Sequence, residues 1–330
     1  MQKKRILFIA PNFFGYYKEI IKELENQNNI VDYVCDFPLN SSLLKAIGRI
    51  NRNILKLCVK KYYKNNVLKL INQNQYDLIF IIVGMTFSFF PEMINEIKEK
   101  TAAQLIMYQW DGEKNIKFIK EYHKFADKLY TFDREDLNSN SKYIFLPLFY
   151  IDKYKEVGLD TKKEYRYDVS YVGTAHPKKL YYINKMVNDS KDLFKNKFIY
   201  HYIPSKFKFI FHKITSEEYK NVKYKDLNNK KLSSEEIMDI FKNSKCIFDS
   251  PQEGQSGLTI RTLECIGAKR KLITTNKDNI NYDFYNPKNI YVYEDGFDKD
   301  SIFFKCEYEE IDKDIYEKYS LKSWLKEMIM

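Results

Sequence analysis

The chain has 330 residues, 44% of them hydrophobic and 30% charged, so it can form two domains with buried cores, and a disordered protein is excluded. The formal net charge is +10, but only seven of the 55 bases are arginine, so the charge alone is weak evidence for a nucleic-acid partner. The five cysteines form no CxxC pair, which argues against a disulfide scaffold or zinc site and fits the reduced thiols of the cytosol.

The first half of the chain alternates short apolar runs with segments of helical periodicity. Residues 77–84 (DLIFIIVG) are the clearest strand, because they are apolar on both faces and end at a glycine. Further strands are predicted over residues 5–10, 30–35, 104–110, 128–132 and 143–148, and helices over residues 16–26 and 91–100. Strands separated by helices form βαβ units, so residues 1–150 are predicted to be a Rossmann-like domain with a mainly parallel sheet.

Residues 151–167 are predicted to be a linker, because they are rich in charge and lack apolar periodicity. The alternation then restarts, and residues 168–313 are predicted to form a second doubly wound α/β domain. Its strands are predicted over residues 168–173, 197–203, 245–249, 271–275 and 289–293, and its helices over residues 177–188, 234–243 and 259–267. Residues 314–330 are predicted to be a C-terminal helix that packs back on the first domain.

Ligands of open α/β sheets bind beyond the carboxyl ends of the strands, which draws attention to the segment from Asp249 to Asn276. There a predicted strand ends, a loop with two glycines follows, and a helix begins near Leu258. Free backbone N–H groups and the helix dipole make that helix start an anion site suited to phosphate. Gly257 lets the backbone approach a ligand closely.

Arg261 and Glu264 lie three residues apart on this helix, so they share one side of it. Arg261 can bind a diphosphate with its fork of donors, and Glu264 can accept two hydrogen bonds from a ribose diol. The alternative is an exposed ion pair on an ordinary helix, and the spacing alone leaves both interpretations open.

Gly173 ends the first predicted strand of the second domain, and Pro177 begins the next helix. Lys178 therefore falls in the first helical turn, where a cation is unfavourable unless an anion lies there too. This favours a phosphate contact by Lys178. The alternative is a lysine without a specific role in a lysine-rich chain.

In the first domain, Asp111 follows the predicted strand over residues 104–110. It could be the general base that takes the proton of an acceptor hydroxyl, or it could stabilise a turn. Asp133 has an equivalent place after the next strand and is predicted to cap the helix that follows. The loop with Phe14 and Gly15 is expected on the acceptor side, because Gly15 permits a tight turn and aromatic rings stack on sugars.

The positive charge is concentrated in one segment. Between residues 37 and 76 there are eight bases and no acid, and apolar residues recur at helical spacing. Residues 43–72 are predicted to form one long basic amphipathic helix or a helix pair, which fits an anionic membrane surface. A second basic and aromatic stretch spans residues 195–213. A solvated helix face is the alternative for both stretches.

No segment has the length expected of a membrane span or a signal peptide. The longest apolar stretch, residues 78–90, contains polar interruptions and falls short of the roughly 20 residues that cross a bilayer. The apolar run after the basic N-terminal residues is also too short for a signal peptide. We therefore expect a cytoplasmic protein, soluble or peripheral at the inner face of the cell membrane.

The run GLTIRTLECIGAKRKLITTN, residues 257–276, resembles the donor-site segment of bacterial GT-B glycosyltransferases, in particular the spore-maturation or polysaccharide glycosyl transferase-like group. Shorter motifs in the same order also resemble this group, namely QWD at 109–111, FDREDL at 132–137, LPL at 146–148 and DVSYVGTAHPKK at 168–179. The resemblance implies two Rossmann-like domains facing across a cleft, with a nucleotide-sugar in the second domain and the acceptor in the first.

By position, the resemblance implies that Glu264 contacts the ribose and Arg261 a phosphate. It also implies a pyrophosphate-facing turn, formed by Ser256, Gly257, Leu258 and Thr259. Many retaining members place two glutamates eight residues apart, whereas Glu253 and Glu264 are eleven apart. Glu253 is therefore a catalytic candidate beside Asp111, and the stereochemical outcome stays open.

The leading hypothesis is a hexosyltransferase-type glycosyltransferase that moves a sugar from a nucleotide-sugar donor to a glycan or lipid-linked acceptor in bacterial surface polysaccharide biosynthesis. A helix N-terminus, Arg261 and Lys178 would stabilise the departing diphosphate. No metal or other cofactor is expected, because no DxD motif follows a predicted strand. Two alternatives are a catalytically inactive GT-B-like partner subunit and a nucleic-acid-binding protein. Scarce arginine and the lack of a nucleic-acid motif count against the second.

Overall fold

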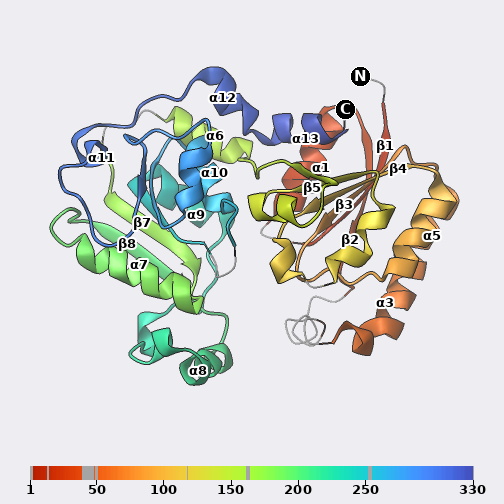
Figure 1. Cartoon of the computed structure of the whole chain (residues 1–330), viewed down its shortest axis with the longest axis horizontal. Coiled ribbons are helices and arrows are strands. Elements are labelled where there is room, and N and C mark those ends of the chain that lie inside the picture. Colours follow the sequence, from red (N-terminus) through yellow and green to blue (C-terminus); the bar gives the residue numbers. More distant parts are fainter. Residues whose placement is uncertain are drawn as a thin grey trace. The chain divides into compact units, whose positions relative to one another are not determined.

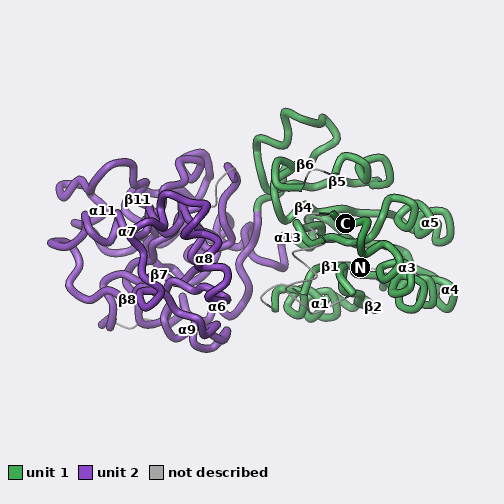
Figure 2. The backbone as a smooth tube through the Cα atoms, turned by 90° about the horizontal axis from the view of Figure 1, so that it is seen from below, with its two compact units in different colours: residues 1–147, 325–330 green, residues 148–324 purple. Residues whose placement is uncertain are grey.

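The computed structural model describes residues 3–12, 15–38, 48, 51–116, 118–160, 164–251 and 255–329. Two parallel sheets with helices beside them make up the chain (Figure 1). The chain divides into two compact units, coloured in Figure 2. Unit 1 comprises residues 1–147 and 325–330, and unit 2 comprises residues 148–324.

Unit 1 contains a six-stranded parallel sheet in the order β2-β1-β3-β4-β5-β6. The strands are β1 (Arg5–Ala10), β2 (Ile30–Cys35), β3 (Leu78–Val83), β4 (Gln104–Gln109), β5 (Lys128–Thr131) and β6 (Tyr143–Phe145). Every residue of β3 is buried, as expected for a central strand covered on both faces. The chain passes from β1 to β2 on one side and returns to β3 on the other. The switch point of this sheet therefore lies at the carboxyl ends of β1 and β3.

The basic stretch of unit 1 is helical without a break from Arg52 to Gln73. It consists of the 3₁₀ turn η1 (Arg52–Leu55), α3 (Lys56–Tyr63), the π-helical turn η2 (Lys64–Leu68) and α4 (Lys69–Gln73). Its buried residues recur at every fourth position, namely Leu55, Val59, Tyr63, Val67 and Ile71. One long helical stretch is thus confirmed for residues 52–72 of the predicted segment, whereas Asn51 before it is extended. Residues 43–47, 49 and 50 lie outside the described residues.

The other helical elements of unit 1 connect the strands. They are α1 (Tyr16–Asn26), α5 (Pro91–Thr101), η3 (Glu113–Asn115), η4 (Ile119–Glu121), η5 (His123–Phe125) and η6 (Arg134–Asn138). None of the helices in the described part of the chain is long and apolar enough to cross a membrane.

Unit 2 contains a five-stranded parallel sheet in the order β11-β10-β9-β7-β8. The strands are β7 (Tyr167–Thr174), β8 (Lys197–Tyr202), β9 (Ser244–Asp249), β10 (Lys271–Thr274) and β11 (Ile290–Val292). Each strand predicted from the sequence is present in the two sheets. In unit 2 the chain leaves β7 for β8 on one side and returns to β9 on the other, so the switch point lies at the carboxyl ends of β7 and β9.

Helices surround this second sheet. They are α7 (Pro177–Asp189), α8 (Lys206–Thr215), α9 (Ser234–Lys242), α10 (Ile260–Gly267) and α11 (Ile302–Lys305), with the 3₁₀ turns η7 (Glu217–Tyr219), η8 (Tyr224–Asp226) and η9 (Lys277–Asn281). The chain order of strands and helices is that of a doubly wound domain, as predicted.

The linker predicted over residues 151–167 was wrong for its first half, because Asp152–Leu159 form helix α6 of unit 2. Tyr154 and Val157 are the buried residues of this helix. Two apolar positions are too weak a pattern to predict a helix from the sequence. A Cβ atom added to Gly158 would lie 2.7 Å from the carbonyl oxygen of Gly267 in α10. The missing side chain of Gly158 therefore allows α6 and α10 to pack closely.

The single C-terminal helix predicted over residues 314–330 is divided into α12 (Lys313–Lys318) and α13 (Leu321–Ile329). The division falls where the backbone pairs with Tyr150, whose N–H donates to Tyr319 O and whose carbonyl accepts from Leu321 N, both at 2.9 Å. Residues 325–330 belong to unit 1, where Lys4 Nζ donates to the carbonyl of Ile329 at 2.6 Å.

Candidate functional site

Asp249 ends β9 at the switch point of unit 2, and its side chain is 1% exposed. Its Oδ2 accepts a hydrogen bond from Thr259 Oγ1 at 2.5 Å, and its Oδ1 lies 3.2 Å from Lys179 Nζ in the first turn of α7. A hydroxyl and a cation thus compensate the burial of this charge. Thr259 is the N-cap residue of α10, but its side chain binds Asp249 instead of capping the helix. We call Asp249, Thr259 and Lys179 the Asp249 cluster.

The turn before α10 is held by Asn276, which follows β10 and is buried. Asn276 Nδ2 donates to the carbonyl oxygens of Ser256 at 3.2 Å and Gly257 at 3.1 Å. Leu258 is buried in the same turn. The turn that the resemblance assigns to pyrophosphate is therefore fixed in place by interior contacts.

Arg261 and Glu264 form an ion pair within α10, with Arg261 Nη1 2.7 Å from Glu264 Oε2. Their side chains are 16% and 5% exposed, so the exposed pair considered from the sequence is not what forms. Burial lowers the pKa of the Arg261 guanidinium, but the charge of Glu264, together with smaller contributions from neighbours that include Asp249, makes the net change upward. The ion pair is therefore almost enclosed by protein.

The remaining contacts of Arg261 also go to the protein. Its Nη2 donates to the carbonyl of Val172 in β7 at 3.2 Å, and its guanidinium lies 5.0 Å from the ring centre of Phe241. Nη2 is therefore engaged by the chain itself, whereas Nη1 has the ion-pair contact with Glu264 but no hydrogen-bond partner among the described residues. The predicted phosphate contact of Arg261 would have to compete with this ion pair.

Gly173 near the end of β7 has a packing reason to be glycine. A Cβ atom there would lie 2.6 Å from Cζ of Tyr171, the residue two positions earlier on the same face of the strand. Tyr171 is fully buried, and burial raises the pKa of its hydroxyl, with a further increase from the charge of Asp249. The Tyr171 ring thus occupies the space that a larger residue at 173 would need.

Lys178 is half-buried in the first turn of α7, as predicted. The pKa of Glu218 is lowered mainly by a hydrogen bond from Ser216 and further by the positive charge of Lys178. The chain itself thus supplies an anion near this lysine. It is the adjacent Lys179 that contacts Asp249.

In unit 1, Asp111 follows β4 and is half-buried. Its Oδ2 accepts a hydrogen bond from the backbone N–H of Met85 at 2.9 Å. A Cβ atom at Gly84 would lie 3.2 Å from the same oxygen, so the carboxylate packs closely on the end of β3. The Asp111 carboxylate therefore stabilises the backbone that follows β3. Its role as a general base stays a prediction.

The structure tests two further predictions for unit 1, the turn at Gly15 and the cap at Asp133. Gly15 has a φ of 83°, so the tight turn before α1 is confirmed. Asp133 accepts a hydrogen bond from Glu135 N at 3.0 Å, which confirms its role as an N-cap. Phe14, and Glu253 of unit 2, lie outside the described residues.

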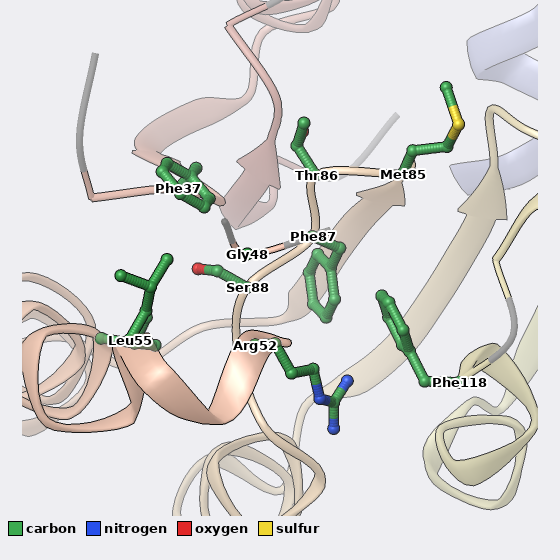
Figure 3. Close-up of a pocket in the computed structure, with 10 residues that line it drawn as sticks. Phe37, Gly48, Arg52, Leu55, Met85, Thr86, Phe87, Ser88 and Phe118 are labelled. Atoms are coloured by element: carbon green, nitrogen blue, oxygen red, sulfur yellow. The ribbon is translucent and has the colours of Figure 1, made fainter. Parts of the chain in front are cut away.

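A small pocket of unit 1 lies beside the segment that follows β3 (Figure 3). Arg52, Ser88 and Phe118 line it. The Arg52 guanidinium lies 4.4 Å from the ring centre of Phe118, and its Nη1 donates to Tyr122 Oη at 2.8 Å. One base of the predicted membrane-facing segment thus points into unit 1.

A buried polar cluster of unit 1 was not found from the sequence. His123 Nε2 lies 2.8 Å from Tyr143 Oη, and its Nδ1 lies 2.9 Å from Asn140 Nδ2. Burial lowers the pKa of His123. Among the described residues, no group of three or more His, Cys, Asp and Glu side chains could hold a metal ion.

No family model and no curated protein matches the sequence. Solved structures do match over almost the whole chain. The lipopolysaccharide outer core galactosyltransferase WaaB is 14% identical and covers 98% of this chain and 99% of its own, with a TM-score of 0.54. HepE of Anabaena, in complex with UDP and glucose, is 10% identical and covers 98% of both chains, with a TM-score of 0.56.

The catalytic domain of starch synthase IV from Arabidopsis thaliana, bound to ADP and acarbose, is 11% identical and covers 98% of this chain and 95% of its own, with a TM-score of 0.58. The chain has a GT-B fold. The two parallel-sheet α/β domains are the architecture that the sequence predicted, and the strand order adds their switch points at β1/β3 and β7/β9.

Proposed function

We propose that this protein is a glycosyltransferase that takes a sugar from a nucleotide-sugar donor. The observation that carries the proposal is the Asp249 cluster beside the buried Arg261–Glu264 pair, at the switch point of unit 2 in a GT-B fold. Solved structures with this fold that contain UDP, UDP-glucose or ADP support it.

In this proposal the donor diphosphate binds at the turn from Ser256 to Thr259 and at the first N–H groups of α10. Glu264 accepts the ribose hydroxyls. Arg261 acts as a positioning residue that orients Glu264, because its Nη1 pairs with Glu264 and its Nη2 donates to the carbonyl of Val172. Gly173 and Lys178 border the site at the end of β7 and the start of α7. Fixed donors of this kind stabilise the charge that develops on a departing diphosphate.

The acceptor is proposed to be a glycan or a lipid-linked glycan in bacterial surface polysaccharide biosynthesis. The likeness to WaaB, a lipopolysaccharide galactosyltransferase, supports this class of acceptor. Asp111 and Glu253 are the candidate catalytic carboxylates, and the loop with Phe14 and Gly15 is proposed on the acceptor side. We propose that the reaction needs no metal.

A peripheral position at an anionic, cytoplasmic membrane face is proposed for residues 43–72. In the described part of this segment, Ile54, Leu57, Lys60, Lys61 and Lys64 are exposed. Arg52 does not belong to this exposed face, because its guanidinium contacts aromatic rings of unit 1. Lys56 Nζ lies 3.0 Å from Glu92 Oε1, so its charge is already paired. Co-sedimentation of a Leu57→Ser, Lys61→Gln variant with anionic vesicles tests this proposal. Binding equal to that of the wild type would reject it.

The donor site is tested by calorimetric titration of the full chain with UDP, ADP, GDP, CMP and TDP. We expect one nucleoside diphosphate to bind, and a variant with Arg261→Met and Glu264→Leu to bind it at least about tenfold more weakly while keeping most of its thermal stability. Equal binding by this variant would reject the site. No binding of any nucleotide, together with binding of DNA or RNA, would favour the nucleic-acid alternative. Binding without turnover of any nucleotide-sugar would favour the inactive partner subunit.

A further inference from the structure

Helix α8 of unit 2 exposes a row of large apolar side chains. Phe207, Ile210, Phe211 and Ile214 are 79%, 54%, 49% and 78% exposed. Their spacing places them on one side of the helix, within an arc of about 100° at about 100° per residue. On most helices of a globular domain such a row faces the core, whereas here it faces away from it.

The opposite side of α8 is anchored to unit 2. His212 is buried, and Phe209 packs against a small core cluster that includes Tyr219. Lys213 Nζ donates to the carbonyl oxygens of Tyr219 and Val222, both at 3.0 Å. These contacts determine which side of the helix faces outward, so the exposed row is a consequence of packing. In Figure 1, α8 lies apart from the strands of its own sheet.

Two lysines border the apolar row. In helical projection, Lys206 and Lys208 lie about 100° on either side of Phe207, at the two edges of the row. Lys208 Nζ lies 5.0 Å from the ring centre of Phe211, so its stem runs along the row. The helix contains no acid, and neither does the surrounding segment, residues 193–216.

We propose that α8 inserts its apolar row into the surface of an anionic lipid bilayer, with Lys206 and Lys208 beside the headgroup phosphates. The phenylalanine and isoleucine side chains match the acyl chains of a bilayer, and the flanking lysines match the negatively charged headgroups above them. A second copy of this helix would cover the apolar row but bring like charges together. This inference depends neither on transferase activity nor on the basic segment of unit 1.

The proposal is tested by co-sedimentation of the full chain with vesicles of phosphatidylcholine alone and of equal parts phosphatidylcholine and phosphatidylglycerol. We expect binding to the anionic vesicles, and a roughly tenfold weaker partition for the Phe207→Ser, Ile214→Ser variant, because two large apolar side chains are no longer buried. Lys206→Gln with Lys208→Gln should reduce the preference for anionic vesicles severalfold. Because all four side chains are exposed, the variants should unfold at the temperature of the wild type.

Leu159→Ser with Ile280→Ser is the matched control, since it removes two exposed apolar side chains elsewhere in unit 2 and should bind like the wild type. A Phe207→Trp variant should have its added fluorescence quenched by brominated lipid. The proposal is overturned if the Phe207→Ser, Ile214→Ser variant binds like the wild type. It is also overturned if sedimentation equilibrium shows a dimer that this variant abolishes, because the occupant is then a second copy of the chain.

Discussion

Arg261 Nη1 and Glu264 Oε2 lie 2.7 Å apart inside unit 2, on the first five residues of α10. The pair is almost enclosed by protein, so its two charges depend on each other. Removing either partner would leave the other charge buried without compensation. Stability and ligand binding at this pair can therefore be separated by the choice of substitution.

The first prediction concerns this pair. Glu264→Leu alone should lower the free energy of unfolding by about 3–5 kcal/mol, because the Arg261 charge stays buried. Adding Arg261→Met should restore most of that loss, since a well-packed apolar pair replaces the ionic one. Urea unfolding of the two variants measures both effects. A single variant as stable as the wild type would show that water reaches the pair.

The second prediction concerns Thr259, whose hydroxyl donates to Asp249. Thr259→Val keeps the shape of the side chain but removes the donor, so the free energy of unfolding should fall by about 1–3 kcal/mol. Thr259→Ser keeps the hydroxyl and should lose much less. If the proposed donor site is right, Thr259→Val should also weaken binding of the nucleoside diphosphate in calorimetry, because Asp249 and the start of α10 are no longer joined.

The third prediction concerns Gly173, where a methyl group would collide with the ring of Tyr171. Gly173→Ala should lower the free energy of unfolding by about 1–3 kcal/mol through overpacking. In a Tyr171→Ala background the same substitution should cost clearly less, because the ring is gone. Chemical unfolding of the four proteins in this cycle provides the measurement. Equal costs in both backgrounds would mean that the Tyr171 ring is not the cause.

The fourth prediction is a pH dependence. Burial, and then the charge of Lys179, lower the pKa of His201 in β8 to about 4. In the unfolded chain the pKa is about 6.5, so the unfolded state binds more protons between these two values. The stabilisation of the folded state by neutral His201 is fully present above about pH 6.5 and is lost as the pH falls toward about 4. The difference between the two pKa values corresponds to about 3 kcal/mol.

Burial also lowers the pKa of His212 to about 4. His212 therefore contributes to the pH dependence of the free energy of unfolding over the same range. His201→Gln should remove only part of the fall in the free energy of unfolding between about pH 7 and pH 5. Urea unfolding of the variant and the wild type at several pH values compares the two slopes. Identical slopes would show that His201 is protonated equally in the folded and unfolded states.

Much of the fold could be predicted because its signal is local. A strand such as β3 is apolar on both faces, and helices such as α9 carry their own capping residues, Ser233 and Glu236. Gly15 and Asp133 were also predictable, since a tight turn and an N-cap depend on neighbouring residues alone. The region of the candidate site followed from the rule that ligands bind at the carboxyl ends of parallel strands.

The partners of the site residues depend on contacts between segments that are far apart in the chain. The spacing of residues in the sequence gives no information about such contacts. Lys179 and Asp249 are 70 positions apart, and only the adjacency of β7 and β9 brings them together. The sequence predicted a side of α10 shared by Arg261 and Glu264, but their burial depends on β7 and Phe241. Helix α6 escaped prediction for the same reason, because its packing depends on the close approach of Gly158 to α10. The residues by themselves determined most of the helices and strands and pointed to the region of the candidate site, whereas the tertiary structure decided which charges are enclosed, because burial is a property of neighbours in space.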